Sequence, residues 1–294
     1  MEQISKNNNA LYFIVIFIAL EAIFFSVGNN NLNKIYLDNE RKLSKIQNIL
    51  DNTSIQAKAV SIYDQTLNRK IYSKNDEIDM PIASLAKIMT VVTALNGYDM
   101  EKVVTIKPEA IKQYGDYGMF VQEKFTIKDL AKITLVGSAN DGAYALSQTE
   151  ENFLQKMNDK AVKIGMENTA FFNPTGLDVD DVFAGAYASA QDVNVMVLYA
   201  LKRYEEVFTS SSLSEINVKS LSGFNHNIKN TDVILSKIPN ILLSKTGYTP
   251  LAGGNLVVVY KSKNGHNIAV TVLGSTIEGR FSDMEKLIGT LETI

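Results

Sequence analysis

The chain contains no cysteine, no tryptophan and only two histidines, His226 and His266, among its 294 residues. The absence of cysteine excludes a disulfide scaffold, a thiolate metal site and a cysteine nucleophile. Two histidines also exclude a metal cluster built on several imidazoles. Any chemistry must therefore come from hydroxyls, amines, carboxylates and backbone groups. We interpret both histidines as surface or loop residues.

Glycine and proline are too scarce, at 17 and five residues, for a low-complexity or disordered chain. With 46% hydrophobic residues the chain can bury a sizeable core, and its length allows one large domain or two small ones. The formal net charge of −3 argues against nucleic acid as a partner, because such proteins usually carry a basic face.

Residues 10–27 form an apolar stretch that only Glu21 interrupts, and this stretch is just long enough to span a membrane. A cleaved signal peptide is the alternative, because Ser26 and Gly28 are small enough for a cleavage site. More lysine and arginine residues follow the stretch than precede it, which by itself would place the body in the cytoplasm. This positive-inside rule predicts orientation less well when a long domain follows the apolar stretch. We expect an anchor or signal peptide over 1–28, a polar helical linker over 29–53 and a folded domain over 54–294.

The remaining chain has strand patterns near both ends and helical patterns between them. Strands are predicted over 59–64, 69–74, 103–106, 240–248, 254–262 and 267–275, with a hairpin turn at Asn264-Gly265. Helices are predicted over 84–95, 126–137, 140–148, 151–165, 188–201 and 281–292. Thr126 and Ser189 are the expected N-caps. This order predicts an α/β domain built on an antiparallel sheet.

Lys87 is the only charged residue of the predicted helix 84–95, which is apolar nearly all round. Burial would lower the pKa of its amine and make it available as a base. Ser84 lies three residues earlier, on the same helix face, where a neighbouring base could turn its hydroxyl into a nucleophile. The free N–H groups of the first turn could stabilise an oxyanion. Alternatively, the lysine reaches the surface and Ser84 is a simple N-cap.

Two further motifs favour the catalytic interpretation. Of four Ser-x-Asn sequences, only Ser138-Ala139-Asn140 follows an apolar helix and opens another, so we expect it in a cleft. Lys-Thr-Gly occurs once, at 245–247, near the end of a predicted strand. There the side chains of Lys245 and Thr246 would point to opposite faces, while Gly247 would let a ligand backbone approach closely.

Ser-x-x-Lys, Ser-x-Asn and Lys-Thr-Gly, in this order, form the signature of penicillin-recognising serine enzymes. The surrounding sequence resembles the D-alanyl-D-alanine carboxypeptidase family, which comprises the low-molecular-mass penicillin-binding proteins, serine peptidases of the S11 type. The resemblance extends from about Lys58 to the final helix. It is carried by VSIYDQTLNRKIYSKNDEIDMPIASLAKIMTVVTAL, GSANDGAYALS, GMENTAFFNPTGLD, AYASAQDV, LLSKTGYTPLAGGNLV and GRFSDMEKLI. It implies a β-lactamase/transpeptidase-like α+β fold, with an antiparallel sheet flanked by helices and a helical subdomain.

The resemblance also assigns roles. It implies that Ser84 attacks the penultimate D-alanine carbonyl of a peptidoglycan stem peptide, with Lys87 as the base and Ser138 as a proton relay. Substrate-binding roles fall to five residues: Asn140, Lys245, Thr246, Gly247 and Tyr248. The amides of Ser84 and Tyr248 would form the oxyanion hole, and Asn140 would also steady Lys87. Neither a metal nor an organic cofactor is implied, and β-lactam antibiotics are expected as inhibitors that acylate Ser84.

Other matching positions receive no catalytic role from us. We interpret NPTGLD at 173–178 as a structural turn near the cleft, and Asn230, Thr231 and Arg280 as structural residues. Many members of the family carry a β-rich domain and an anchoring helix after the peptidase domain, and the printed sequence ends without them. We therefore expect the N-terminal segment to provide a membrane anchor, with the catalytic domain outside the cytoplasm, or a secreted protein if that segment is cleaved.

Three rival functions remain open from the sequence. A peptidoglycan endopeptidase of the same fold would carry the same motifs. A class A β-lactamase needs a glutamate for deacylation, but Glu150 and Glu151 come too soon after Asn140 and NPTGLD contains none. A binding or sensory module is disfavoured because every proposed catalytic side chain is present.

Overall fold

The computed structural model describes residues 40–97, 99–115 and 117–293. The chain divides into two compact units, residues 1–51 with 294 and Asn52–Thr293. Of the first unit, residues 40–51 are described and are helical, and the linker over 29–53 stays a prediction. The apolar stretch 10–27 lies outside the described residues, so its role as anchor or signal peptide stays a prediction. Among the helices that the structure describes, none has both the length and the apolar composition needed to cross a membrane.

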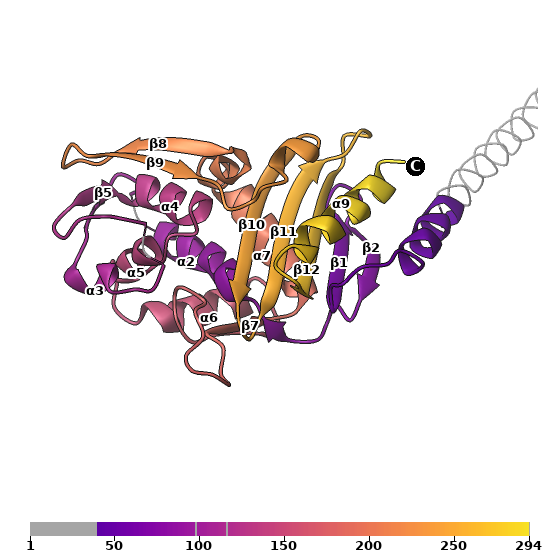
Figure 1. Cartoon of the computed structure of the whole chain (residues 1–294), viewed down its shortest axis with the longest axis horizontal. Helices are drawn as coiled ribbons and strands as arrows, with labels where there is room; N and C mark the ends of the chain where they lie inside the picture. The colour runs from indigo at the N-terminus through magenta and orange to yellow at the C-terminus, as the bar shows by residue number, and fades with distance from the viewer. Residues whose placement is uncertain (1–39, 98, 116, 294) are drawn as a thin grey trace, which may run out of the picture. The chain divides into compact units, whose positions relative to one another are not determined.

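The second unit is organised around a five-stranded antiparallel sheet in the order β10-β11-β12-β1-β2 (Figure 1). These strands are β1 (Ala59–Asp64), β2 (Arg69–Lys74), β10 (Ile241–Thr249), β11 (Gly253–Lys261) and β12 (Asn267–Ser275). The hairpin connection between β11 and β12 turns at residues 263–265, where the Gly265 amide donates to the Ser262 carbonyl at 2.8 Å and the Ser262 amide donates to the His266 carbonyl at 2.9 Å. Gly265 has a φ of 82° but Asn264 does not have a positive φ, so the connection is a three-residue turn with glycine in the left-handed position and not the two-residue turn that the Asn-Gly pair predicts. The antiparallel sheet predicted from the sequence is confirmed.

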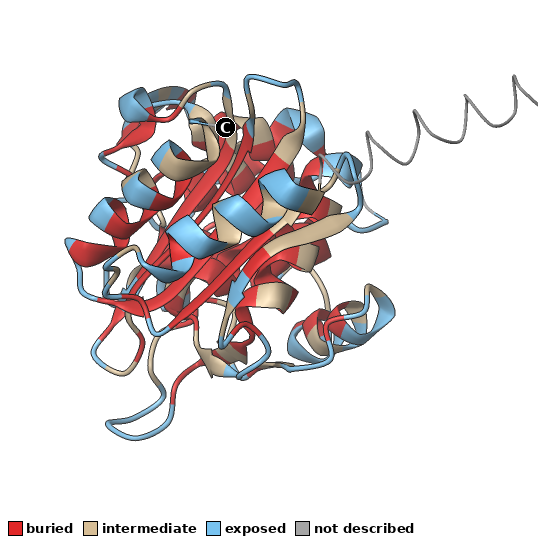
Figure 2. Ribbon diagram, turned by 90° about the vertical axis from the view of Figure 1, so that its right-hand side faces the viewer, coloured by how far each residue is buried: buried red, intermediate tan, exposed pale blue. Residues whose placement is uncertain are grey.

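Both faces of the sheet are covered by helices. On one face, α9 (Gly279–Leu291) packs on β11 and β12, burying Phe281, Met284 and Leu287. On the other face, α7 (Ala190–Arg203) packs on β1 and β12. Because side chains alternate between the faces of a strand, strands covered on both sides are largely apolar, as residues 256–260 of β11 are. Figure 2 shows the strands beneath α9 largely buried; β1, β11 and β12 are almost wholly buried, whereas only one residue of the edge strand β2 is.

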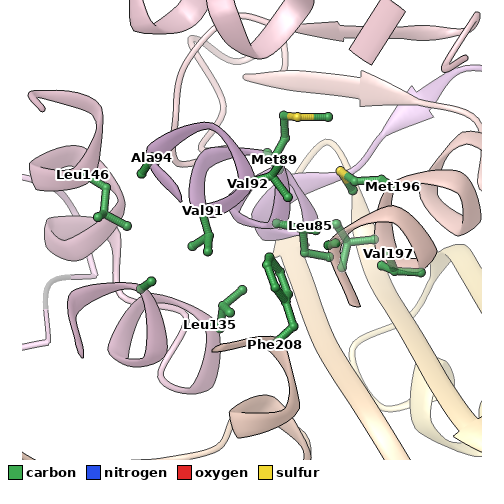
Figure 3. Close-up of a cluster of buried hydrophobic side chains, with 14 of the residues drawn as sticks. Leu85, Met89, Val91, Val92, Ala94, Leu135, Leu146, Met196, Val197 and Phe208 are labelled. Atoms are coloured by element: carbon green, nitrogen blue, oxygen red, sulfur yellow. The ribbon is translucent and has the colours of Figure 1, made fainter. Parts of the chain in front are cut away.

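The helical layer surrounds α2 (Ala86–Leu95), in which all ten residues are buried. In Figure 3 its Met89, Val91 and Val92 lie among Leu135, Leu146, Met196 and Phe208, which come from four other helices. Each such side chain contributes about 1.5–3 kcal/mol when fully buried. The neighbouring helices are α4 (Ile127–Val136), α5 (Asn140–Ser147), α6 (Phe153–Lys163) and α8 (Glu205–Phe208). This packing fixes the start of α2 relative to the sheet.

The predicted N-caps are confirmed by hydrogen bonds. Thr126 Oγ1 accepts the amide of Asp129 at 3.0 Å, and Ser189 Oγ accepts the amide of Asp192 at 3.1 Å. Each cap satisfies an amide that has no partner within its helix. The two helices therefore begin where the sequence predicts.

Several short elements were not predicted. They are the three-stranded sheet of β3 (Met80–Pro81), β7 (Ala186–Ala188) and β6 (Thr169–Phe171), the strand β5 (Lys124–Thr126) that pairs with β4 (Val103–Thr105), the helix α3 (Pro108–Ile111), and the hairpin of β8 (Glu215–Lys219) and β9 (Asn225–Lys229). These strands have two to five residues each, too short for a clear alternating pattern. The hairpin packs on α4 of the helical layer (Figure 1).

Candidate active site

Ser84 and Lys87 come together at the start of α2. Ser84 lies in the 3-10 turn η1 (Ala83–Leu85), and Lys87 lies in the first turn of α2. The Nζ atom of Lys87 lies 2.8 Å from Ser84 Oγ and donates to the carbonyl oxygen of Thr175 at 2.7 Å. Lys87 is fully buried, so the alternative of a lysine that reaches the surface is wrong. The hydroxyl and the amine are placed as a nucleophile and a base need to be.

The burial of Lys87 changes its protonation. Desolvation lowers the pKa of its amine from 10.5 to about 7, and the negative charge of Asp141 opposes part of that fall. Part of the Lys87 amines is therefore neutral near pH 7 and can accept a proton. This agrees with the expectation that burial would make the lysine a base.

Ser138 and Asn140 lie at the junction of α4 and α5. Ser138 has a φ of 56°, a conformation in which a non-glycine residue is strained. Asn140 Nδ2 donates to the Tyr114 carbonyl at 2.6 Å, and its Oδ1 is buried with no hydrogen-bond partner in the part of the chain that the structure describes. The expected contact of Asn140 with Lys87 is therefore not made. The orphan oxygen is an acceptor for a ligand N–H group.

Lys245 joins the Ser-x-Asn segment to the sheet. Its Nζ donates to Ser138 Oγ at 2.7 Å and to the Thr246 carbonyl at 2.8 Å. Lys245 is 2% exposed, and burial, together with the positive charges of Lys87 and Arg280, holds its pKa well below the ordinary value. The site therefore contains two hydroxyl–amine pairs, Ser84 with Lys87 and Ser138 with Lys245.

Gly247 lets β10 approach the nucleophile. A Cβ atom at this position would lie 2.8 Å from the Ile82 carbonyl oxygen and 3.3 Å from the Ser84 amide nitrogen. Only glycine allows so close a contact without displacing backbone. The strand continues to Thr249, so Lys-Thr-Gly lies within the strand rather than at its end. Tyr248 follows with 46% exposure, at the surface beside this contact.

Thr246 and Lys245 point to different partners, as their positions on a strand predict. Thr246 Oγ1 lies 2.6 Å from Thr231 Oγ1, whereas Lys245 reaches Ser138. Arg280, from α9, donates from its Nη1 to the Gly247 carbonyl at 2.8 Å. Its Nε is buried and has no hydrogen-bond partner among the described residues. Thr231 and Arg280 were interpreted as structural, but the structure places both at the site.

The segment 173–178 also reaches the site. The backbone carbonyl of Thr175 accepts a hydrogen bond from the Lys87 amine. The backbone carbonyl of Pro174 accepts one from the Thr90 hydroxyl at 2.6 Å. The interpretation as a turn near the cleft fits this backbone contact. The family resemblance includes Thr231 and Arg280, but no local pattern shows that these residues or the Thr175 carbonyl reach the site, because each contacts a residue distant in sequence.

Only one of the two histidines lies at the surface or in a loop, as we expect for both. His266 lies beside the β11–β12 turn, and its Nδ1 is 2.7 Å from Asp64 Oδ2. His226 lies in β9, and its Nε2 is 2.8 Å from the buried Glu123 carboxylate. Its side chain is only 9% exposed, so the expectation of a surface or loop residue is wrong for His226. The pair connects the β8–β9 hairpin to the loop before β5.

Comparisons with known proteins agree with this geometry. Residues 46–276 match the family model described as D-alanyl-D-alanine carboxypeptidase, and this range contains all three motifs. The chain is 29% identical over 243 residues to the D-alanyl-D-alanine carboxypeptidase DacF of Bacillus subtilis (strain 168), covering 79% of this chain. The chain spans 61% of the length of that relative. It is 30% identical over 249 residues to a D-alanyl-D-alanine endopeptidase of Pseudomonas aeruginosa, covering 79% of this chain and 76% of the relative.

Solved structures with the same fold include penicillin-binding protein D2 from Listeria monocytogenes in its cefotaxime-bound form. The TM-score is 0.71 at 26% identity, and the match covers 81% of this chain and 98% of that one. A mutant of the Streptomyces K15 DD-transpeptidase matches with a TM-score of 0.73 at 24% identity, over 83% of this chain and all of that one. The α+β fold with an antiparallel sheet and a helical layer is the fold of these proteins.

Proposed function

Because the chain belongs to the D-alanyl-D-alanine carboxypeptidase family of serine peptidases, we propose that it removes the terminal D-alanine from peptidoglycan stem peptides. The observation that carries this proposal is the buried amine of Lys87, 2.8 Å from the hydroxyl of Ser84. A neutral amine at this distance takes the hydroxyl proton as the oxygen attacks a carbonyl carbon.

The first step forms an acyl-enzyme. Ser84 Oγ bonds to the carbonyl carbon of the penultimate D-alanine, while its proton passes to Lys87 Nζ. The amides of Ser84 and Tyr248 stabilise the oxyanion that develops on the carbonyl oxygen. The peptide C–N bond then breaks, and the departing D-alanine nitrogen takes the proton that Lys87 received, relayed through the hydroxyl of Ser138, so that Lys87 is neutral again. Lys245, 2.7 Å from Ser138 Oγ, holds that hydroxyl in place. Asn140 Oδ1 accepts an N–H group of the bound peptide.

The terminal carboxylate of the substrate is recognised by a group of cationic and hydroxyl donors. Lys245, Thr246 and Arg280 supply these donors from β10 and α9. A carboxylate entering this site favours the protonated form of Lys245, whose pKa is low in the free protein because of burial and neighbouring positive charge. The buried Arg280 Nε offers one more unpaired donor. Water then hydrolyses the acyl-enzyme, and Lys87 is again the proton acceptor.

A peptidoglycan endopeptidase is the second candidate. It is favoured by the Pseudomonas aeruginosa relative, of which the chain covers a larger share than of the Bacillus subtilis carboxypeptidase. The same acylation chemistry would then cut a crosslink between two stem peptides rather than release free D-alanine.

The test uses the purified full chain with penicillin and with a peptide that ends in D-Ala-D-Ala. The carboxypeptidase is expected to form a stable penicillin adduct by intact mass and to release D-alanine from the peptide. Lys87→Ala is expected to abolish the adduct while the protein stays folded. Adduct formation without D-alanine release, together with cleavage of crosslinked dimers, would establish the endopeptidase instead.

The same experiment separates a β-lactamase and a silent binding module. Rapid turnover of penicillin would indicate a β-lactamase, which the absence of glutamate from residues 173–178 disfavours. No adduct at all would indicate a binding module. Persistent labelling of Lys87→Ala would show that the assignment of the base is wrong.

For localisation, our proposal is a membrane-attached protein with its catalytic unit outside the cytoplasm. It is supported by the apolar stretch 10–27 and by the location of peptidoglycan stem peptides outside the membrane. Cell fractionation is expected to place the full chain with membranes and a chain that starts at residue 52 in the soluble fraction. Recovery of a shortened mature protein from the medium would support the cleaved signal peptide.

A further inference from the structure

The turn at residues 173–177 holds the Lys87 amine through its backbone. Thr175 presents its carbonyl oxygen to Lys87 Nζ at 2.7 Å, and the preceding carbonyl, of Pro174, accepts the hydroxyl of Thr90 at 2.6 Å. Lys87 and Thr90 are three residues apart on α2 and therefore share a face of that helix. The adjacent carbonyls of Pro174 and Thr175 thus accept hydrogen bonds from Thr90 and Lys87, two side chains on the same face of α2.

Asn173 fixes the shape of this turn. Its Oδ1 accepts three hydrogen bonds, from the Thr175 amide at 3.1 Å, the Thr175 hydroxyl at 3.0 Å and the Gly176 amide at 2.7 Å. Its Nδ2 donates to the Leu177 carbonyl at 2.8 Å. One side chain therefore fixes the backbone on both sides of the Thr175 carbonyl.

The 173–177 turn also packs closely against η1, the turn that carries Ser84. Gly176 has a φ of 75°, and a Cβ atom there would lie 1.9 Å from the Ala83 carbonyl oxygen. Ala83 precedes Ser84 and itself has a φ of 48°. A movement of the turn would therefore change both the surroundings of the amine and the backbone that carries Ser84.

The contact to Thr175 decides the orientation of the Lys87 lone pair. A neutral amine has two N–H groups and one lone pair, and the hydroxyl of Ser84 must donate to that lone pair before it can transfer its proton. An N–H group held by the Thr175 carbonyl restricts the rotation of the amine and leaves the lone pair free for Ser84. The turn also keeps Lys87 out of water.

We propose that Asn173 is a positioning residue for the base: it fixes the 173–177 turn so that the Thr175 carbonyl orients and shields the Lys87 amine for proton transfer from Ser84. This inference rests on the proposed acylation of Ser84. The negative charge of Asp141, from α5, also acts on the Lys87 amine, and the positive charge of Lys87 acts on Lys245 in β10. Neither residue is a hydrogen-bond partner of Asn173.

The test measures the rate constant of penicillin acylation between pH 5.5 and 9.5 for the full chain and for Asn173→Ala. In the wild type we expect the rate to rise with pH and to level off above about 7, the pKa of the base. Asn173→Ala is expected to acylate about tenfold more slowly or worse at pH 7, because misplacing a catalytic group by about 1 Å has effects of this size. Its profile is expected to level off at higher pH, because water that reaches Lys87 raises the pKa of the amine.

Asn158→Ala is the matched control. The Asn158 side chain also binds backbone groups: it accepts a hydrogen bond from the Phe171 amide and donates one to the Phe171 carbonyl, each at 2.9 Å. It makes no hydrogen bond to the turn that binds Lys87. It is expected to lower the thermal midpoint without moving the pH at which acylation levels off. A similar shift in Asn158→Ala would overturn the proposal, as would an unshifted profile in folded Asn173→Ala.

If Asn173→Ala does not fold, Thr90→Val tests whether the 173–177 turn positions the Lys87 amine. It removes only the hydroxyl that binds the Pro174 carbonyl, and it is expected to shift the profile in the same direction by a smaller amount. An unshifted profile in Thr90→Val would then overturn the proposal. If the wild type itself is not acylated, the proposed function fails, and this outcome is distinct from a failure of the inference about Asn173.

Discussion

At the scale of single residues, the burial of Lys87 is an energetic burden on the folded protein. The pKa of its amine falls from 10.5 to about 7 on folding because the charged form loses its hydration. The unfolded chain therefore binds more protons than the folded one between pH 7 and 10.5, and the stability of the fold rises with pH across this window. Below pH 7 the full cost is present, and the shift corresponds to about 5 kcal/mol.

We therefore expect Lys87→Met to be more stable than the wild type at pH 7 although it is inactive. The substitution removes the cost of burying the charge but leaves the Thr175 carbonyl without a donor, a loss of about 1–3 kcal/mol. The expected net gain in the free energy of unfolding is about 1–3 kcal/mol at pH 7, and it disappears as the pH approaches 10. Urea unfolding at pH 7 and 9.5 measures it.

Lys163→Met, on the exposed side of α6, is the control for this measurement and should show no pH-dependent gain. A Lys87→Met protein whose stability relative to wild type is the same at both pH values would contradict the prediction. Such a result would mean that the amine is not desolvated in solution.

Some residues of the site can be predicted from the sequence, and others cannot. A single lysine in a nearly all-apolar helix, three residues after a serine, suggests the Ser84–Lys87 pair but leaves a surface lysine open. The Ser-x-Asn and Lys-Thr-Gly motifs are needed to favour the pair. Thr231 and Arg280 could not be placed this way, because their contacts to Thr246 and Gly247 are formed only when distant segments fold together. The orphan Oδ1 of Asn140 is likewise visible only in three dimensions.

At the scale of elements, the close approach of β10 to η1 determines the geometry of the site. The Gly247 backbone lies against the Ile82 carbonyl and the Ser84 amide, so any side chain at 247 would push the strand and the nucleophile apart. The strand remains anchored along its length by pairing with β11. A change at this point should therefore affect the reaction more than the fold.

We expect Gly247→Ala to reduce penicillin acylation by at least about tenfold, since small misplacements of reacting groups have effects of this order. Stopped-flow or mass-based acylation kinetics, alongside thermal unfolding, would measure both effects. Gly289→Ala in α9, where a Cβ meets nothing within 4 Å, is the matched control. It should leave acylation unchanged and stabilise the helix slightly. Normal acylation in Gly247→Ala would refute the role assigned to this contact.

Elements differ in how well the sequence predicts them. Helix α2 and strands β10 to β12 have long uniform patterns and were predicted to within a few residues. The β8–β9 hairpin was missed because each strand buries only one residue fully, Val218 in β8 and Ile228 in β9. Its position is determined by contacts such as His226 with Glu123 rather than by its own hydrophobic pattern.

At the scale of the whole molecule, the site is assembled entirely within the unit Asn52–Thr293. The nucleophile turn, the Ser-x-Asn junction and the Lys-Thr-Gly strand all belong to it. The boundary predicted from sequence at residue 54 lies two residues from the start of this unit, and the extent of the catalytic domain stays a prediction.

A chain that begins at residue 52 is therefore expected to fold and to be acylated by penicillin at the same rate as the full chain. The comparison requires intact mass, acylation kinetics and the thermal midpoint of both proteins, measured in the same detergent-containing buffer. A large loss of acylation in the shortened chain would show that residues 1–51 contribute to the site.

The pairing of β1 with β12 joins Val60 to Val272, two positions more than 200 residues apart in the chain. A ribosome therefore releases the serine and its lysine long before the strand that completes the sheet has been synthesised. Arg280, which binds the Gly247 carbonyl, emerges later still. Contacts of such long range form slowly, and the site lacks Arg280 until α9 has been made. Premature termination between residues 265 and 279 would remove Arg280 and, before residue 275, part or all of β12, and would thus yield a polypeptide with every signature motif and an incomplete site.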